Sequence, residues 1–387
     1  MARFSRPLLA LILGQISLHS CMAGVRMAAP LQALKQGHAE WAVGVLLALF
    51  ATAPIALALF AGRMADRHGY HRPLYVAVAM SLAGGVIAAV SSHYLAMCAA
   101  AVLCGGGANF GLIAIQRTAG RMATDTTERM RVFSWLGLAP ALSNVAGPVT
   151  AGVLIDLAGF RTAFAVLMLM PLAALFWARA VPVEVPVAAG EAMLRRQTSW
   201  DLLRLPGLSR LLLVNWLLSA SWDVHTFVLP ILGHERGLSA SAIGGILGLF
   251  AVSVAAVRLV IPVLAHRLTA SQVLASAMLS VAGVFAFYPF VHSAWLMALC
   301  AAMLGLALGS VQPMVMSTLH NITPHERHGE AIAFRSMAIN LSSTLMPLLF
   351  GVAGAALGAA SLFWLMGAAV GAGSLPARRI GSAVEQA

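Results

Sequence analysis

The stretch GRMADRHGYHRP, from Gly62 to Pro73, decides how the sequence is interpreted. It concentrates charged and titratable side chains in a chain in which only 10% of the residues are charged. Those side chains are Arg63, Asp66, Arg67, His68, His71 and Arg72. Strongly apolar sequence flanks the stretch on both sides, so we interpret it as a charged loop between two apolar helices.

The composition outside this loop is that of a polytopic membrane protein. The 387 residues are 60% hydrophobic, with a mean hydropathy of +0.88. A soluble domain carries about 25% charged residues, well above the fraction found here. Because lipid cannot satisfy backbone hydrogen bonds, the spans are predicted to be helices and the fold to be all-α.

Twelve segments are long and apolar enough to span a membrane, since a span needs about 20 mostly apolar residues. They are 7–28, 41–62, 73–91, 95–117, 132–156, 161–180, 208–231, 241–265, 272–292, 294–319, 330–355 and 359–375.

The distribution of cations predicts the orientation. With both termini placed in the cytoplasm, nearly all arginines outside the spans fall on the cytoplasmic side, and only Lys35, Arg161 and Arg236 fall on the other. Short basic loops of this kind contact anionic lipid headgroups, so the net charge of +11 does not require nucleic acid as a partner.

The sequence repeats itself at an offset of 200 residues. WAVGVLLALF from Trp41 matches SAIGGILGLF from Ser241, and near an offset of 198 TERMR around Glu128 matches HERHG around Glu326. The repeat predicts a six-helix bundle over 1–180, a cytoplasmic linker over 181–207 and a second six-helix bundle over 208–387. It also makes the first span a counterpart of the seventh rather than a cleaved lipoprotein signal ending at Cys21.

The opening stretch resembles a motif of the major facilitator superfamily, which reads G-x-x-x-D-R-x-G-x-x-R between helices 2 and 3. Here the motif residues are Gly62, Asp66, Arg67, Gly69 and Arg72. The resemblance implies a twelve-helix secondary transporter built from two parallel six-helix repeats. In the second half the motif is degenerate, with His266 in place of the acid.

The resemblance further implies that Asp66 meets the N-terminal end of helix 11, near Glu330, where a helix favours a carboxylate. Four arginines are expected to complete a conformational latch with it: Arg67, Arg72, Arg129 and Arg131. The alternative is that these charges only orient the loop by the positive-inside rule.

A partial motif in helix 5 suggests efflux. GPVTAG, with Gly147, Pro148 and Gly152, resembles the Gly-Pro motif of the family's antiporters. The match is incomplete, because Ser134 and Ser143 stand where glycines are expected.

Polar residues within spans are candidates for substrate binding. In the first span they share one helical face, made of Gln15, His19, Met22 and Arg26, and the repeat places Asn215, Ser219 and Trp222 on a matching face. Helices 4 and 11 add Asn109, Gln116 and Asn340. The alternative is that these side chains only bond helix to helix.

Asp223 is the only acid deep within a span, and it is a candidate for proton coupling together with His19. The alternative for Asp223 is a static ion pair with Arg26. Arginines in the predicted path outnumber this one acid, which favours an anionic or zwitterionic substrate.

The sequence therefore predicts a monomeric transporter of the bacterial inner membrane that exports a small organic molecule by proton-coupled alternating access. Its predicted partners are that molecule, protons and membrane lipids. The alternatives are a proton symporter importing a carboxylate, sugar or metal chelate, and a non-transporting receptor or scaffold. No nucleophile–base pair, paired carboxylates, phosphate loop or metal-ligand cluster indicates an enzyme, a cofactor or a metal.

Overall fold

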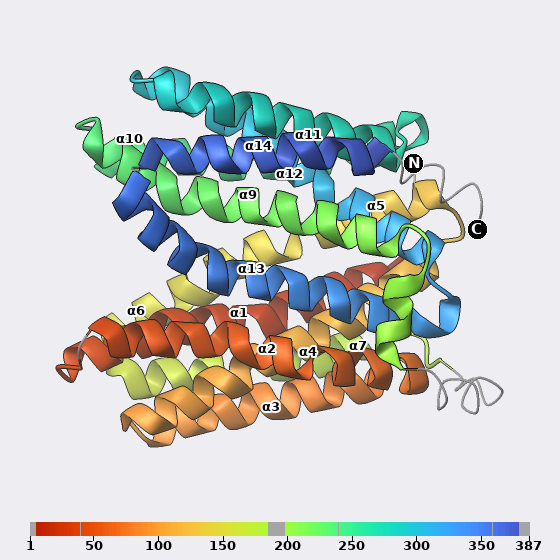
Figure 1. The fold of residues 1–387 in the computed structure, drawn as a ribbon. Coiled ribbons are helices and arrows are strands. Elements are labelled where there is room, and N and C mark those ends of the chain that lie inside the picture. The colour runs from red at the N-terminus through yellow and green to blue at the C-terminus, as the bar shows by residue number, and fades with distance from the viewer. Residues whose placement is uncertain (1–4, 39, 185–197, 239, 358, 379–387) are drawn as a thin grey trace. The chain divides into compact units, whose positions relative to one another are not determined.

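The computed structural model describes residues 5–38, 40–184, 198–238, 240–357 and 359–378, and within them every regular element is a helix (Figure 1). The elements are α1 (Arg6–Lys35), α2 (Glu40–His68), α3 (His71–Val90), α4 (Tyr94–Met122), α5 (Thr126–Leu136), α6 (Ala139–Leu167), α7 (Met170–Ala178), η1 (Ser199–Arg204), α9 (Leu208–Glu235), α10 (Ala240–Leu264), η2 (Ala265–Arg267), α11 (Ala270–Phe287), η3 (Tyr288–Phe290), α12 (Ala294–Ile322), η4 (His325–Arg327), α13 (His328–Leu357) and α14 (Ala359–Arg378).

The prediction of an all-helical membrane protein is confirmed. Among the described residues, nine helices are long and apolar enough to cross a membrane. One of them, Thr126–Ala178, runs for 53 residues and is broken by Gly159, whose φ of 82° is not helical. A single crossing needs about 20 residues, so this segment has the length for two crossings.

The predicted fifth and sixth spans, 132–156 and 161–180, each cover parts of two helices. Helix α5 begins at Thr126 and ends at Leu136, and α6 begins at Ala139 with a proline in its first turn. Another proline lies in the first turn of α7. Proline fits the first turn of a helix, where an N–H group would have no intrahelical acceptor. Farther along a helix it cannot donate to the carbonyl group four residues earlier, so the preceding helix ends before it. Pro140 and Pro171 thus explain both breaks, which apolar length alone does not reveal.

Packing divides the chain into two compact units. Unit 1 comprises Met1–Met122, Leu136–Ser199 and His325–Asn340, and unit 2 comprises Ala123–Trp135, Trp200–Pro324 and Leu341–Ala387. Nearly all of α5 thus packs in unit 2, and the first part of α13 packs in unit 1. The repeat predicted two bundles that are each continuous in the sequence, and these boundaries stay a prediction. The packing units differ from them in that α5 and the first part of α13 each pack with the other half of the chain.

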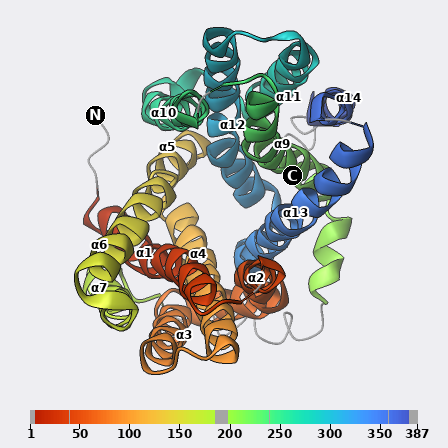
Figure 2. The same ribbon diagram turned by 90° about the vertical axis from the view of Figure 1, so that its left-hand side faces the viewer.

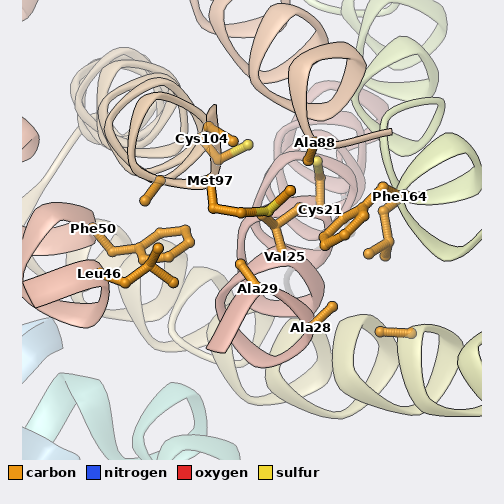
Figure 3. Close-up of a cluster of buried hydrophobic side chains, with 14 residues drawn as sticks. Cys21, Val25, Ala28, Ala29, Leu46, Phe50, Ala88, Met97, Cys104 and Phe164 are labelled. Atoms are coloured by element: carbon orange, nitrogen blue, oxygen red, sulfur yellow. The ribbon is translucent and has the colours of Figure 1, made fainter. Parts of the chain in front are cut away.

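In unit 1, α1 packs against α6, α7 and α4, and Figure 2 shows it among them. Buried apolar side chains join α1, α4 and α6 with α2 and α3 (Figure 3). They include Cys21 and Val25 of α1, Phe50 of α2 and Phe164 of α6. Cys21 is a free, fully buried thiol in this cluster, where it packs as a small apolar residue.

In unit 2, α9 packs against α14 and α12, α10 against α12, and α11 against α14 and α12. The internal repeat is visible at the end of the first helix of each half. Gln36 Nε2 donates to the carbonyl oxygen of Ser92 at 2.8 Å, and 200 positions later Arg236 donates to the carbonyl oxygen of Val291.

Candidate functional site

The carboxylate of Asp66, near the end of α2, lies against the first turn of α13. Oδ1 accepts a hydrogen bond from the backbone N–H of Gly329 at 2.8 Å, and Oδ2 accepts one from Glu330 N–H at 3.0 Å. The first N–H groups of a helix have no intrahelical acceptor and carry a partial positive charge. An anionic side chain at this position therefore caps α13.

Arg117 of α4 is the cation that balances Asp66. Its Nε lies 2.9 Å from Asp66 Oδ1, and both side chains are only 1% exposed. Its Nη1 lies 2.8 Å from Glu184 Oε2, and Arg121 lies 3.3 Å from the same oxygen. Two arginines and two acids therefore form one network. We call Gly62, Asp66, Arg117, Gly329 and Glu330 the Asp66 cluster.

The side chain of Glu330 connects the Asp66 cluster to two further arginines, Arg63 and Arg327. Its Oε1 lies 3.0 Å from Arg63 Nε and accepts a hydrogen bond from Ser199 Oγ at 3.1 Å. Its Oε2 lies 2.6 Å from Arg327 Nη2. Next to them, burial lowers the pKa of His325, and the guanidinium of Arg121 lowers it further.

The described parts of the predicted linker are bound to this network. Glu184 precedes the undescribed segment and pairs with Arg117, whereas Ser199 follows it and bonds to Glu330. Thr198 adds its carbonyl oxygen, which accepts from Arg327 Nη2 at 2.9 Å.

The arginine that the structure pairs with Asp66 is Arg117, and a place beside Asp66 for the four arginines expected there stays a prediction. Arg67 is half-buried and Arg72 is exposed. Arg129 and Arg131 belong to unit 2, where Arg129 bonds to Asn321 and Arg131 to the carbonyl oxygen of Pro262. The expectation followed from nearness in the charged loops, but the ion pair observed for Asp66 comes from within a span.

Arg117 was not assigned to the cluster from the sequence, because an arginine near a helix end also reaches the membrane surface through its long side chain. Gly329 was missed because nothing in its immediate sequence distinguishes it. The available signal was the charge balance, since a buried carboxylate needs a buried cation or several donors.

The predicted polar face of α1 combines buried and exposed groups. Gln15 is 1% exposed, and neither its amide oxygen nor its amide nitrogen has a hydrogen-bond partner among the described residues. His19 Nδ1 is likewise buried without a partner in the described chain. Met22 is half-buried and Arg26 is exposed. Unpaired buried polar groups are rare in proteins, and a role of Gln15 and His19 in substrate binding stays a prediction.

The matching face of α9 lies in unit 2. Asn215 is buried, and Ser219 and Trp222 are half-buried. The ring of Trp222 packs edge-on against Phe250, with 4.7 Å between centroids.

Asp223 binds α13 through two hydroxyl groups. Ser342 Oγ donates to its Oδ2 at 2.9 Å, and Ser343 Oγ donates to its Oδ1 at 3.4 Å. The alternative for Asp223, a static ion pair with Arg26, stays a prediction.

The candidates on α4 and α13 are bonded to each other within unit 1. Ser336 Oγ donates to Asn109 Oδ1 at 2.5 Å, and Asn340 Nδ2 donates to the Ser336 carbonyl oxygen at 2.8 Å. Asn109 Nδ2 also donates to the Pro54 carbonyl oxygen of α2 at 3.4 Å. These contacts fit the helix-bonding alternative for Asn109 and Asn340. Gln116 is buried in α4.

The helix-5 motif lies on α6. A Cβ on Gly147 would lie 2.2 Å from the carbonyl oxygen of Ser20, whereas a Cβ on Gly152 would meet Met27 at an ordinary 3.5 Å. Gly147 thus lets α6 approach α1 closely. Pro148 follows it inside α6.

The sequence matches the model of the Major Facilitator Superfamily over residues 11–269 and 211–380. No curated protein matches it. Many solved structures share its fold, among them the following three. The human organic anion transporter MFSD10 (TETRAN) has a TM-score of 0.80 at 16% identity, covering 96% of this chain and 99% of that chain. A bacterial homologue of the iron transporter ferroportin, in an outward-facing state, has a TM-score of 0.76 at 17% identity, covering 98% and 100%. The proton:xylose symporter XylE has a TM-score of 0.73 at 14% identity, covering 96% and 94%.

Proposed function

Because the chain belongs to the Major Facilitator Superfamily, a family of membrane transporters, we propose that it exports a small anionic or zwitterionic organic molecule in exchange for protons. Transport proceeds by alternating access, in which two helical bundles move about a site near the middle of the membrane.

Asp223 carries this proposal. It lies in an apolar helix, and its carboxylate accepts hydrogen bonds from Ser342 and Ser343 of α13. An ionised carboxylate only accepts hydrogen bonds, whereas a protonated one also carries an O–H donor. Binding of a proton to Asp223 therefore changes the bonding between α9 and α13.

Helix α13 offers a route from this proton site to the Asp66 cluster. The same helix carries Gly329 in its first turn and Ser342 thirteen residues later, a rise of about 20 Å. In the proposed mechanism, protonation of Asp223 frees the later part of α13, and the resulting shift is transmitted to the hydrogen bonds between its first turn and Asp66. The cluster then acts as a latch that holds one state and opens in the other.

Two features support the substrate class and direction. Arg26 is exposed on α1, and on the same predicted face Gln15 and His19 have buried polar atoms without a partner among the described residues. An organic anion transporter shares this fold. Export rests on the likeness of Gly147, Pro148 and Gly152 to the motif of antiporters.

The test is anion-dependent proton flux. The purified protein is reconstituted into sealed vesicles containing a pH-sensitive dye, a pH gradient is imposed, and a panel of organic anions and zwitterions is added. We expect a subset of compounds to dissipate the gradient, and we expect Asp223→Asn to reduce that flux at least about ten-fold. Asp156→Asn is the matched control, since Asp156 is an exposed acid on α6.

Each outcome decides one part of the proposal. Full flux in Asp223→Asn would remove the proton role of Asp223. Movement of substrate and protons in the same direction would show the importing symporter instead. A folded protein that moves none of the compounds, with or without a gradient, would favour the receptor or scaffold.

A further inference from the structure

Helix α5 is held in unit 2 by two side chains that donate to backbone carbonyl groups of α10. Arg131 Nε donates to the carbonyl oxygen of Pro262 at 2.9 Å. Ser134 Oγ donates to the carbonyl oxygen of Arg258. Arg131 and Ser134 are three residues apart on α5, so they lie on the same side of the helix. We call these four residues the α5 clasp.

Pro262 explains why these carbonyl groups accept from a neighbouring helix. In an α-helix the carbonyl oxygen of residue 258 accepts from the N–H of residue 262, but proline has no N–H. The carbonyl oxygen of Pro262 itself lies in the last turn of α10, which ends at Leu264, where carbonyl groups lack intrahelical donors. Arg131 and Ser134 donate to these two acceptors, and the guanidinium also lies at the negative end of the helix dipole.

The internal repeat relates this clasp to the Asp66 cluster. At the offset of 200, Pro262 and His266 correspond to Gly62 and Asp66, and at the offset of 198 Arg131 corresponds to Gly329. In unit 1, a side chain of α2 accepts from backbone N–H groups of α13. In unit 2, the direction is reversed, because a side chain of α5 donates to the backbone of α10.

The start of α5 does not require an acid at position 266. Glu128 N–H donates to Asp125 Oδ1 at 2.7 Å, and Glu128 Oε2 accepts from Thr124 N–H at 2.7 Å. These bonds cap the helix locally, in the manner of a capping box. The first turn of α13, in contrast, donates to Asp66. Where the first half has Asp66, the second half has His266, which cannot cap a helix as a carboxylate does. Helix α5 is capped by its own residues instead, and Arg131 supplies the contact with α10.

We infer that Arg131 and Ser134 are positioning residues, which hold α5 on α10 through a contact whose donor and acceptor sides are reversed relative to the Asp66 cluster. The inference also explains Ser134, which stands where the antiporter motif has a glycine: its hydroxyl supplies the donor that Pro262 lacks. It goes beyond the proposed function and does not depend on the substrate or on proton coupling.

Hydrogen–deuterium exchange of the full-length protein in lipid nanodiscs tests the clasp without transport. We expect Arg131→Ala to accelerate exchange in the peptide covering Thr126–Leu136 about ten-fold or more, since a hydrogen bond from a charged group is lost. Arg210→Ala, which removes an exposed arginine of α9, is the matched control. Equal exchange in these two variants would overturn the role of Arg131.

A double-mutant comparison tests the role of Pro262. Pro262→Ala keeps the carbonyl group that Arg131 binds and restores an N–H donor for the Arg258 carbonyl group. Ser134→Ala should therefore accelerate exchange of α5 several-fold in the wild-type background and have little effect beside Pro262→Ala. An equal effect of Ser134→Ala in both backgrounds would refute the proposed role of Ser134. This comparison does not use Arg131→Ala, so it still tests the clasp if that variant fails to fold.

Discussion

A methyl group on Gly62 would lie 2.4 Å from the carbonyl oxygen of Gly329, and a methyl group on Gly329 would lie 2.4 Å from the carbonyl oxygen of Gly62. Both contacts are far below van der Waals distance. The opposing atoms belong to the backbone, so no change of side-chain rotamer can relieve the clash. This mutual approach of α2 and α13 brings Asp66 within hydrogen-bonding distance of the first turn of α13.

Gly329→Ala should therefore disrupt the Asp66 cluster. We expect the substitution to destabilise the protein by about 1–3 kcal/mol, as overpacking does, and to lower its apparent Tm. Gly245→Ala in α10 is the matched control, because a Cβ there meets nothing within 4 Å. Equal thermal stability of the two variants in the same detergent would show that α2 and α13 do not need this approach.

Asp66→Asn should strongly destabilise unit 1, because it leaves Arg117 with one of its two acids. Removal of one partner of a buried ion pair costs about 3–5 kcal/mol. The double variant Asp66→Asn with Arg117→Gln should be less destabilised than the sum of the two single variants. Thermal unfolding of all four proteins measures this coupling, and strict additivity would mean that the two side chains act independently.

Within the helix-5 motif, the two glycines should respond differently. Gly147→Ala places a methyl group 2.2 Å from the Ser20 carbonyl oxygen and should separate α6 from α1, whereas Gly152→Ala makes only an ordinary contact with Met27. We expect a lower apparent Tm for Gly147→Ala and little change for Gly152→Ala. The reverse order would contradict the packing described for α1 and α6.

Gln15→Leu should stabilise the protein and impair its function. The amide of Gln15 is buried without a partner in the described chain, and burial of an unpaired amide costs about 1–3 kcal/mol. Leucine removes that cost at similar volume, so the apparent Tm should rise while substrate-dependent flux falls. Unchanged flux would indicate that Gln15 does not contact the substrate.

Apolar length and the charged loop were sufficient to predict the membrane class, the all-helical fold and the family. They were not sufficient for contacts between residues distant in the chain. Arg117 belongs to the Asp66 cluster because α4 packs beside α2, a relation that no local pattern encodes. Gly329 was missed for the same reason, since its requirement comes from Gly62, far away in the sequence. The bond from Arg131 to the Pro262 carbonyl oxygen was likewise not predicted, because a cation is attracted both by a carboxylate and by the carbonyl end of a helix.

The exchange of α5 and the first part of α13 between the units has a practical consequence for fragment expression. A polypeptide ending in the linker would lack His325–Asn340, and its Asp66 would have no helix terminus to cap. The complementary polypeptide would lack Ala123–Trp135 and would expose the proline-interrupted end of α10. Neither fragment should therefore reach a native state when synthesised alone, whereas simultaneous synthesis of both in one cell should restore a folded, co-purifying pair.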